Sequence, residues 1–142
     1  MADFTLTATV AVPHDKALAL VRDALVDAGF GVLTEIDLSA TFRAKLGVEI
    51  PPQVILGACR PQLARAALLA DPRIAALLPC NVVVTSAGDD STTVTVLDPD
   101  VLHALTDHPD LVNVVADARK RISQMLNALT ATDKEPENAT GA

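Results

Sequence analysis

The sequence is poor in aromatic residues, with no Trp, no Tyr and only three Phe among 142 residues. Half of the residues are nevertheless apolar. A core must therefore be packed mainly from small and branched aliphatic side chains, with Phe4, Phe30 and Phe42 as its only large members. The chain length suits one domain with one core.

Basic residues are also scarce, with 11 Lys and Arg against 18 Asp and Glu, for a formal charge of −7. Affinity for a phosphate backbone comes from Lys and Arg, so the composition argues against a nucleic-acid partner. No apolar run approaches the ~20 residues of a membrane span, and the N-terminus lacks the features of a signal peptide. We therefore expect no membrane partner and a cytoplasmic location, where two cysteines remain free thiols.

Sequence motifs of common enzyme classes are missing. There is no G-x-S-x-G, no Walker loop and no dinucleotide fingerprint. The cysteines are too far apart for a zinc signature, and His14, His103 and His108 are scattered. The sequence assigns no catalytic residue and no cofactor, and it leaves open whether the protein is an enzyme.

The hydrophobic pattern alternates between the periods of strands and helices. It predicts strands at residues 4–12, 30–36, 53–58, 81–86 and 92–97, and helices at 13–28, 38–46, 61–70 and from 110 onward. Caps support these boundaries, with Asp37 or Ser39 starting the second helix and Gly47 ending it. We predict a single α+β domain over residues 1–132 and a disordered polar tail over residues 133–142.

Both cysteines lie where a strand meets a turn. Cys59 ends an apolar strand and precedes Arg60 and Pro61, which opens a helix; the helix dipole and the guanidinium would both favour its thiolate. Cys80 follows Pro79 at the start of another strand. The two thiols can face each other if these strands are neighbours. The alternative is that each is a small buried apolar side chain.

An acidic pair, Glu35 and Asp37, ends the second strand, and Lys45 follows about two helical turns later. Two close carboxylates can hold a cation or share a proton. Structural roles explain each residue separately, since Asp37 can cap the helix, Glu35 can be solvated, and Lys45 can be an exposed ion-pair partner.

Several of these segments resemble the DUF302 family, a domain of unknown function. They are Glu35-Ile36-Asp37-Leu38, Lys45-Leu46-Gly47, Ile55-Leu56-Gly57-Ala58-Cys59 with Pro61, Asp71-Pro72, Leu78-Pro79-Cys80-Asn81-Val82 and Asp98-Pro99. The resemblance covers roughly residues 4 to 130. It implies a two-layer α+β fold, with helices on a curved, mainly antiparallel sheet similar in topology to one repeat of the TATA-binding protein. It also implies a homodimer. Arg60 departs from the family pattern, where a small polar residue is usual.

We interpret the protein as a binding module for a small ligand or a soft metal ion. The candidate contacts are Cys59, Cys80, Glu35, Asp37, Lys45 and Asn81. This hypothesis requires the thiols and the acidic pair to share one hollow. One alternative is a thiol-dependent enzyme or redox protein, with Cys59 as nucleophile and Cys80 as resolving thiol. Another is a protein that acts only through its dimer surface.

Overall fold

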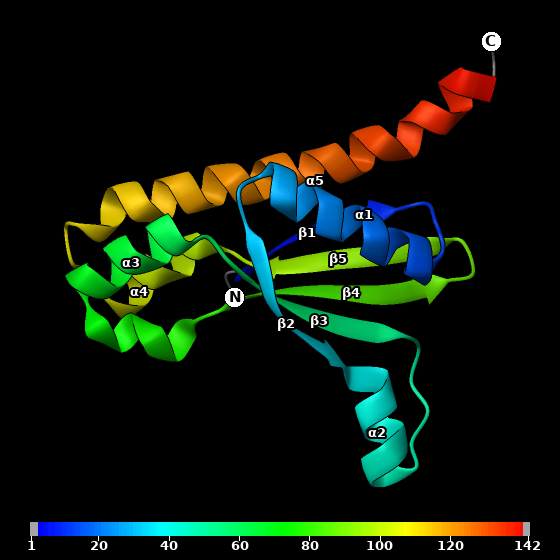
Figure 1. The fold of residues 1–142 in the computed structure, drawn as a ribbon, viewed down its shortest axis with the longest axis horizontal. Helices are drawn as coiled ribbons and strands as arrows, with labels where there is room; N and C mark the ends of the chain where they lie inside the picture. The colour runs from blue at the N-terminus through cyan, green and yellow to red at the C-terminus, as the bar shows by residue number, and fades with distance from the viewer. Residues whose placement is uncertain (1–2, 141–142) are drawn as a thin grey trace.

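The computed structural model describes residues 3–140, with side chains described up to residue 130. Five strands form one antiparallel sheet in the order β1-β5-β4-β3-β2 (Figure 1). The strands are β1 (Thr5–Val10), β2 (Gly31–Asp37), β3 (Gln53–Cys59), β4 (Cys80–Gly88) and β5 (Ser91–Leu97). The helices are α1 (His14–Asp27), α2 (Leu38–Leu46), α3 (Pro61–Ala70), η1 (Pro72–Leu77), η2 (Pro99–Val101), α4 (Leu102–Leu105) and α5 (Leu111–Thr140).

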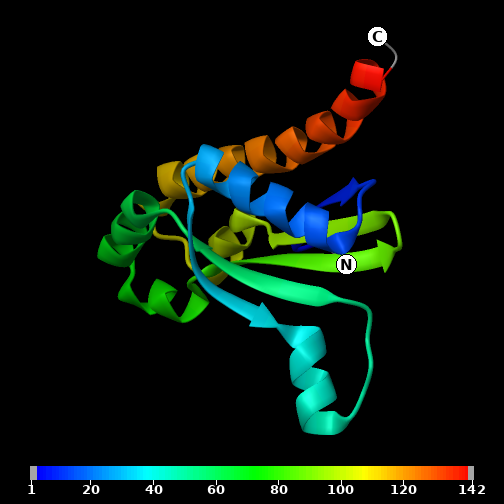
Figure 2. The ribbon, with the colours of Figure 1, turned by 45° about the vertical axis from the view of Figure 1, so that its right-hand side comes forward.

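Helices α1 and α5 lie side by side on one face of the sheet and form the second layer (Figures 1 and 2). Their buried side chains pack with those of the central strands in one hydrophobic cluster, in which Leu25, Met125 and Leu129 meet Val82 and Val94. The predicted α+β class, with helices on an antiparallel sheet, is confirmed.

The β4–β5 hairpin shows how alternation builds this sheet. Val82 pairs with Val96 and Val84 pairs with Val94, and all four side chains are buried. Thr93, between two buried positions, faces the other side of the sheet, as the period of two requires. The strand pattern therefore buries Val82, Val84, Val94 and Val96 under the helices and places Thr93 and Thr95 on the opposite face.

Helix α5 contributes the predicted apolar stripe. Leu111, Val115, Ile122, Met125 and Leu129 are buried and Ala118 is half-buried. The backbone of α5 continues to Thr140, across most of the segment predicted to be a disordered tail; residues 141–142 lie outside the described residues. Extending an existing helix costs far less than nucleating one. Within the described part of the chain, no helix has the length and apolar character of a membrane span.

The three phenylalanines do not form the core as predicted. Phe30 is buried, but Phe4 is 60% exposed and Phe42 is half-exposed. Phe4 precedes the edge strand β1, and Phe42 lies on α2, which extends away from the main body of the domain (Figure 1). Aliphatic side chains fill nearly all of the interior instead.

Helix α2 projects from the end of β2 on the side of the sheet opposite α1 and α5 (Figure 2). Both of its predicted caps are present: the Asp37 side chain accepts a hydrogen bond from the Ala40 amide at 2.9 Å, and Gly47 adopts the left-handed conformation with φ of 66°. Ser39 is its only buried residue. The helix is well defined locally but has few partners in the rest of the domain.

Candidate functional site

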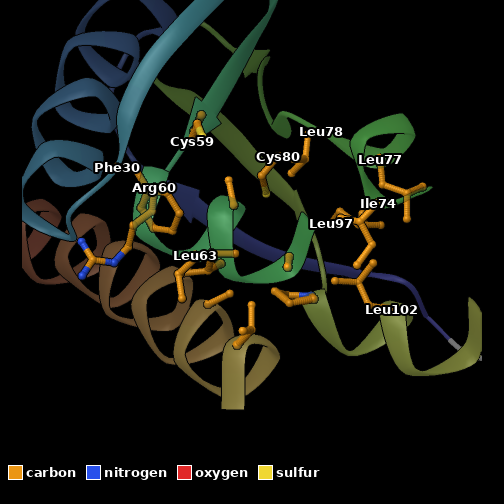
Figure 3. Close-up of a pocket in the computed structure, with 17 residues that line it drawn as sticks. Phe30, Cys59, Arg60, Leu63, Ile74, Leu77, Leu78, Cys80, Leu97 and Leu102 are labelled. Carbon is orange, nitrogen blue, oxygen red and sulfur yellow. The ribbon is translucent and has the colours of Figure 1, made fainter. Parts of the chain in front are cut away.

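A cavity of about 110 Å³ lies where β3 ends and β4 begins (Figure 3). Its walls come from the strand ends, α3, η1, η2, α4 and α5. The lining residues are Phe30, Ala58, Cys59, Arg60, Leu63, Ala64, Ala67, Ile74, Leu77, Leu78, Cys80, Leu97, Pro99, Leu102, Val114, Ala118 and Ile122. Apart from the Arg60 side chain and the two thiols, every lining side chain is a hydrocarbon.

The cavity separates two hydrophobic clusters. Ala58 and Ile122 belong to the main cluster between the sheet and α1 and α5. Ala67 and Ile74 belong to a smaller cluster with Leu111 and Val115. Because α3 presents alanines toward the gap, the two clusters do not merge, and apolar space remains between them.

A polar network fixes the outer wall. The Asp71 carboxylate accepts hydrogen bonds from the Arg73 amide at 3.0 Å, from Arg73 Nη2 at 2.8 Å and from Thr106 Oγ1 at 3.1 Å. The hydrogen bonds from Arg73 and Thr106 hold the pKa of Asp71 well below its usual range. These bonds join the start of η1 to the end of α4, two elements that line the cavity.

The two thiols come from neighbouring strands and both line the cavity. Cys80 pairs with Ala58 across the β3–β4 ladder, and Cys59 is the next residue along β3. Both cysteines are free. Burial, and secondarily the negative charge that Cys59 can carry, raises the pKa of Cys80 to about 11. Cys80 is therefore a neutral thiol near pH 7, which makes it a poor nucleophile and a poor metal ligand.

The Arg60 guanidinium points away from both thiols, toward the end of α1 (Figure 3). Its Nη1 donates to the Gly29 carbonyl at 3.4 Å, and its Nε lies 4.0 Å from Asp117 Oδ2. The expected pairing of this guanidinium with the Cys59 thiol is not seen. The aliphatic part of Arg60 instead forms part of the cavity wall.

The acidic pair lies toward the other end of the sheet. Gly31 on β2 pairs with Cys59, whereas Asp37 pairs with Val54, six residues farther along β2 or about 20 Å at the strand rise. Neither Glu35 nor Asp37 lines the cavity. The expectation that thiols and carboxylates share one hollow was wrong, because β2, although bulged between Val32 and Thr34, carries the carboxylates along the sheet away from Cys59.

Each acidic residue instead has a local partner. Glu35 forms an ion pair with Arg22 of α1. Asp37 caps α2 and accepts a hydrogen bond from Ser39 Oγ at 2.6 Å. The bonds from Ser39 and from the Ala40 amide lower the pKa of Asp37. These contacts match the structural alternative that the sequence left open for Asp37.

The remaining predicted contacts also lie outside the cavity. Lys45 is exposed on α2, and Asn81 is exposed on β4, where it pairs with Gly57. Among the described residues, no three His, Cys, Asp or Glu side chains are arranged to hold a metal ion. Of the six predicted contacts, the structure brings only Cys59 and Cys80 together at the cavity.

Most of the wall was not singled out from the sequence. Phe30, Leu63, Ile74, Leu97 and Leu102 line the cavity, but as single apolar residues they resemble ordinary core positions. The feature of the sequence that could have indicated the cavity is the run of alanines in α3. Their side chains are too small to fill the space beside one face of the helix.

The family model for the domain of unknown function DUF302 matches residues 6–129. The chain belongs to this family. A solved DUF302 structure, the uncharacterized conserved protein from Bacillus stearothermophilus, is 28% identical with a TM-score of 0.81, over 90% of this chain and 99% of that one. A search of curated proteins found no match. The family confirms the resemblance seen in the sequence, and it assigns no activity to the cavity.

Proposed function

We propose that this DUF302 domain binds a small apolar ligand in the cavity beside Cys59 and Cys80. The supporting observation is the almost wholly hydrocarbon lining of a space of about 110 Å³. An engineered, enclosed apolar cavity of about 150 Å³ binds benzene. A ligand body of benzene size or slightly smaller would regain the contacts that the empty space forfeits.

The thiols act in this proposal as polarizable contacts and not as reactive groups. Cys80 would have to lose a proton to hold a soft metal ion or to attack a disulfide, and its burial opposes that loss. Metal binding and thiol catalysis are therefore less well supported than apolar binding. Two free cysteines suit the reducing cytosol, so a cytoplasmic location remains part of the proposal.

Benzene and hexan-1-ol serve as probes, and ligand-induced chemical-shift changes in a ¹H–¹⁵N NMR spectrum serve as the measurement. We expect shifts concentrated at cavity residues. Ala64→Leu should abolish them, because Ala64 lines the cavity and the larger side chain fills it. Ala66→Leu is the matched control, since Ala66 is exposed on the same helix. Equal binding by both variants, or shifts spread elsewhere, would contradict the proposal.

Self-association is a second candidate function, favoured by the surface of α2. Leu46, the last residue of α2, is 69% exposed, and Val48, in the connector that follows Gly47, is 46% exposed. A second copy of this chain is the occupant that we propose for this surface. Adjacent exposed apolar side chains of this kind can mark a protein–protein contact surface.

Charge supports a symmetric pair. Helix α2 carries Lys45 and also Arg43, which is ion-paired with Glu49 at 2.8 Å, whereas the β4–β5 turn carries the exposed Asp89 and Asp90. The two features share one end of the sheet, because the Ser86 amide donates to the Pro52 carbonyl at 2.8 Å. In a two-fold dimer, the basic helix of each copy can meet the acidic turn of the other.

A further inference from the structure

We infer that the cavity ligand is a short-chain carboxylic acid whose hydrocarbon part fills the cavity and whose carboxylate binds Arg60. This inference rests on the proposed function and adds the chemical class of the ligand. It starts from an unsatisfied donor: Arg60 Nε is buried and, among the described residues, has no hydrogen-bond partner. A buried donor on a charged group is costly to leave unpaired, and a carboxylate oxygen is its strongest acceptor.

The neighbouring carboxylate is already in use. Asp117 Oδ2 accepts a hydrogen bond from Arg121 Nε at 3.1 Å, whereas Arg60 Nε lies 4.0 Å from the same oxygen. Two guanidinium groups therefore share one carboxylate. This cluster of three side chains carries one more positive than negative charge, and a second carboxylate would balance it.

The two guanidinium groups converge because residue 29 has no side chain. A Cβ built on Gly29 would lie 2.8 Å from Arg60 Nη1 and 3.0 Å from Arg121 Nη1. Each arginine also donates to a carbonyl at the end of α1, Arg60 to Gly29 and Arg121 to Ala28. These bonds hold the cations in place, and in the described part of the chain they leave Arg60 Nε without a hydrogen-bond partner.

The direction of the Arg60 side chain determines where the hydrocarbon part and the carboxylate of the ligand would lie. The hydrocarbon part of Arg60 forms the cavity wall next to Leu63 and Phe30, and its guanidinium extends from that wall toward α1 and α5 (Figure 3). The five-carbon hydrocarbon part of hexanoate would occupy the cavity, with its carboxylate directed along the Arg60 side chain toward the guanidinium. Charge-assisted pairing with arginine is specific for such an oxyanion and would not favour an uncharged hydroxyl of the same chain length.

The test compares hexanoate with hexan-1-ol on the full chain by calorimetry or NMR titration. We expect hexanoate to bind the unmodified protein at least about tenfold more tightly than the alcohol, which is about 1.4 kcal/mol. Arg60→Met keeps a hydrocarbon wall and should remove this preference, so that the variant binds the acid and the alcohol with affinities equal to within about twofold. Arg65→Met is the control, because Arg65 is exposed on α3.

A second variant, Asp117→Asn, tests the inference even if Arg60→Met does not fold. Asp117→Asn removes the competing carboxylate, so it should strengthen hexanoate binding by about threefold or more and leave hexanol unchanged. Equal affinity for acid and alcohol, unaffected by either variant, would overturn the carboxylate inference and leave the apolar cavity as proposed. Absence of binding by both probes would overturn the inference and the proposed function together.

Discussion

Gly57 of β3 lies directly against the ring of Pro79, with no room for a side chain between them. A Cβ at residue 57 would lie 2.8 Å from Pro79 Cγ and would also collide with Thr34 Oγ1. The proline ring cannot rotate away, so the backbone would have to move. Because Pro79 immediately precedes Cys80, this contact sets where β4 enters the cavity wall.

We therefore expect Gly57→Ala to lower the free energy of unfolding by about 1 to 3 kcal/mol, the usual cost of overpacking. Urea denaturation measures it. Gly31→Ala is the matched control, because its Cβ would lie 3.8 Å from the Cys59 carbonyl oxygen, an ordinary contact. A Gly57→Ala variant as stable as Gly31→Ala would show that Pro79 does not confine this position.

Cys80 should be alkylated slowly at neutral pH. Burial raises its pKa from 9.0 to about 11, so the reactive thiolate fraction near pH 8 is about a hundredfold lower than for an unperturbed cysteine. The reaction of iodoacetamide with a Cys59→Ala variant, followed by mass spectrometry, measures this rate. Protein unfolded in urea supplies the reference. Equal rates in the folded and unfolded chains would show that Cys80 is not protected.

The same group makes the fold sensitive to alkali. The unfolded chain releases the Cys80 proton near pH 9, whereas the folded chain retains it to about pH 11. The free energy of unfolding should therefore fall as the pH rises through this interval. Cys80→Ala should reduce the slope, and urea titrations at several pH values would detect the change. If the free energy of unfolding of Cys80→Ala falls with pH as steeply as that of the wild type, other groups cause the decrease.

Asp71 should make the cavity wall sensitive to acid. Hydrogen bonds from Arg73 and Thr106 lower its pKa, so their stabilisation is present above the unfolded pKa of about 3.9 and is lost as the pH falls below that value. Asp71→Asn should lower the melting temperature at pH 7 and flatten its decline in acid. Asp23→Asn, at an exposed position of α1, is the control. Calorimetry that shows identical pH profiles for wild type and Asp71→Asn would refute this role.

The self-association proposal predicts a specific effect at one exposed leucine. Leu46→Ser should shift a dimer toward monomer by at least about tenfold in dissociation constant, because it removes an apolar side chain from the proposed seam. Leu69→Ser is the control, since both leucines are 69% exposed. Sedimentation equilibrium measures the effect, and higher salt should also weaken the dimer. A wild-type protein that is monomeric at 100 µM, about the range of weak dimers, would refute the proposal.

The hydrophobic periodicity of the sequence was sufficient to predict the helices and strands. It was insufficient to predict which residues meet at the cavity. The stripe of α5 and the caps of α2 depend on residues a few positions apart, so a linear pattern specifies them. The site depends on which strand ends meet. Glu35 and Asp37 are close to Gly31 in sequence, yet an extended β2 carries them to the far end of the sheet from Cys59.

The cavity could not be predicted because no single apolar lining residue is distinctive in the sequence. Leu63, Ile74 and Leu102 are individually unremarkable apolar residues, and only the packing of α3, η1 and α4 against the strand ends shows that they fail to fill a space. Arg60 carried a clear signal that was assigned to the wrong partner. Its helix-start position suggested the adjacent thiol, whereas its length lets it reach the end of α1.

The gap between the two hydrophobic clusters also has a consequence for local stability. The smaller cluster, with Ala67 and Ile74, adjoins the larger one across the cavity. Local unfolding of α3 and η1 therefore leaves the larger cluster intact. A molecule seated in the gap would join the clusters into one cooperative unit. Its binding should slow amide hydrogen exchange most in α3 and η1, far from the already protected centre of the sheet.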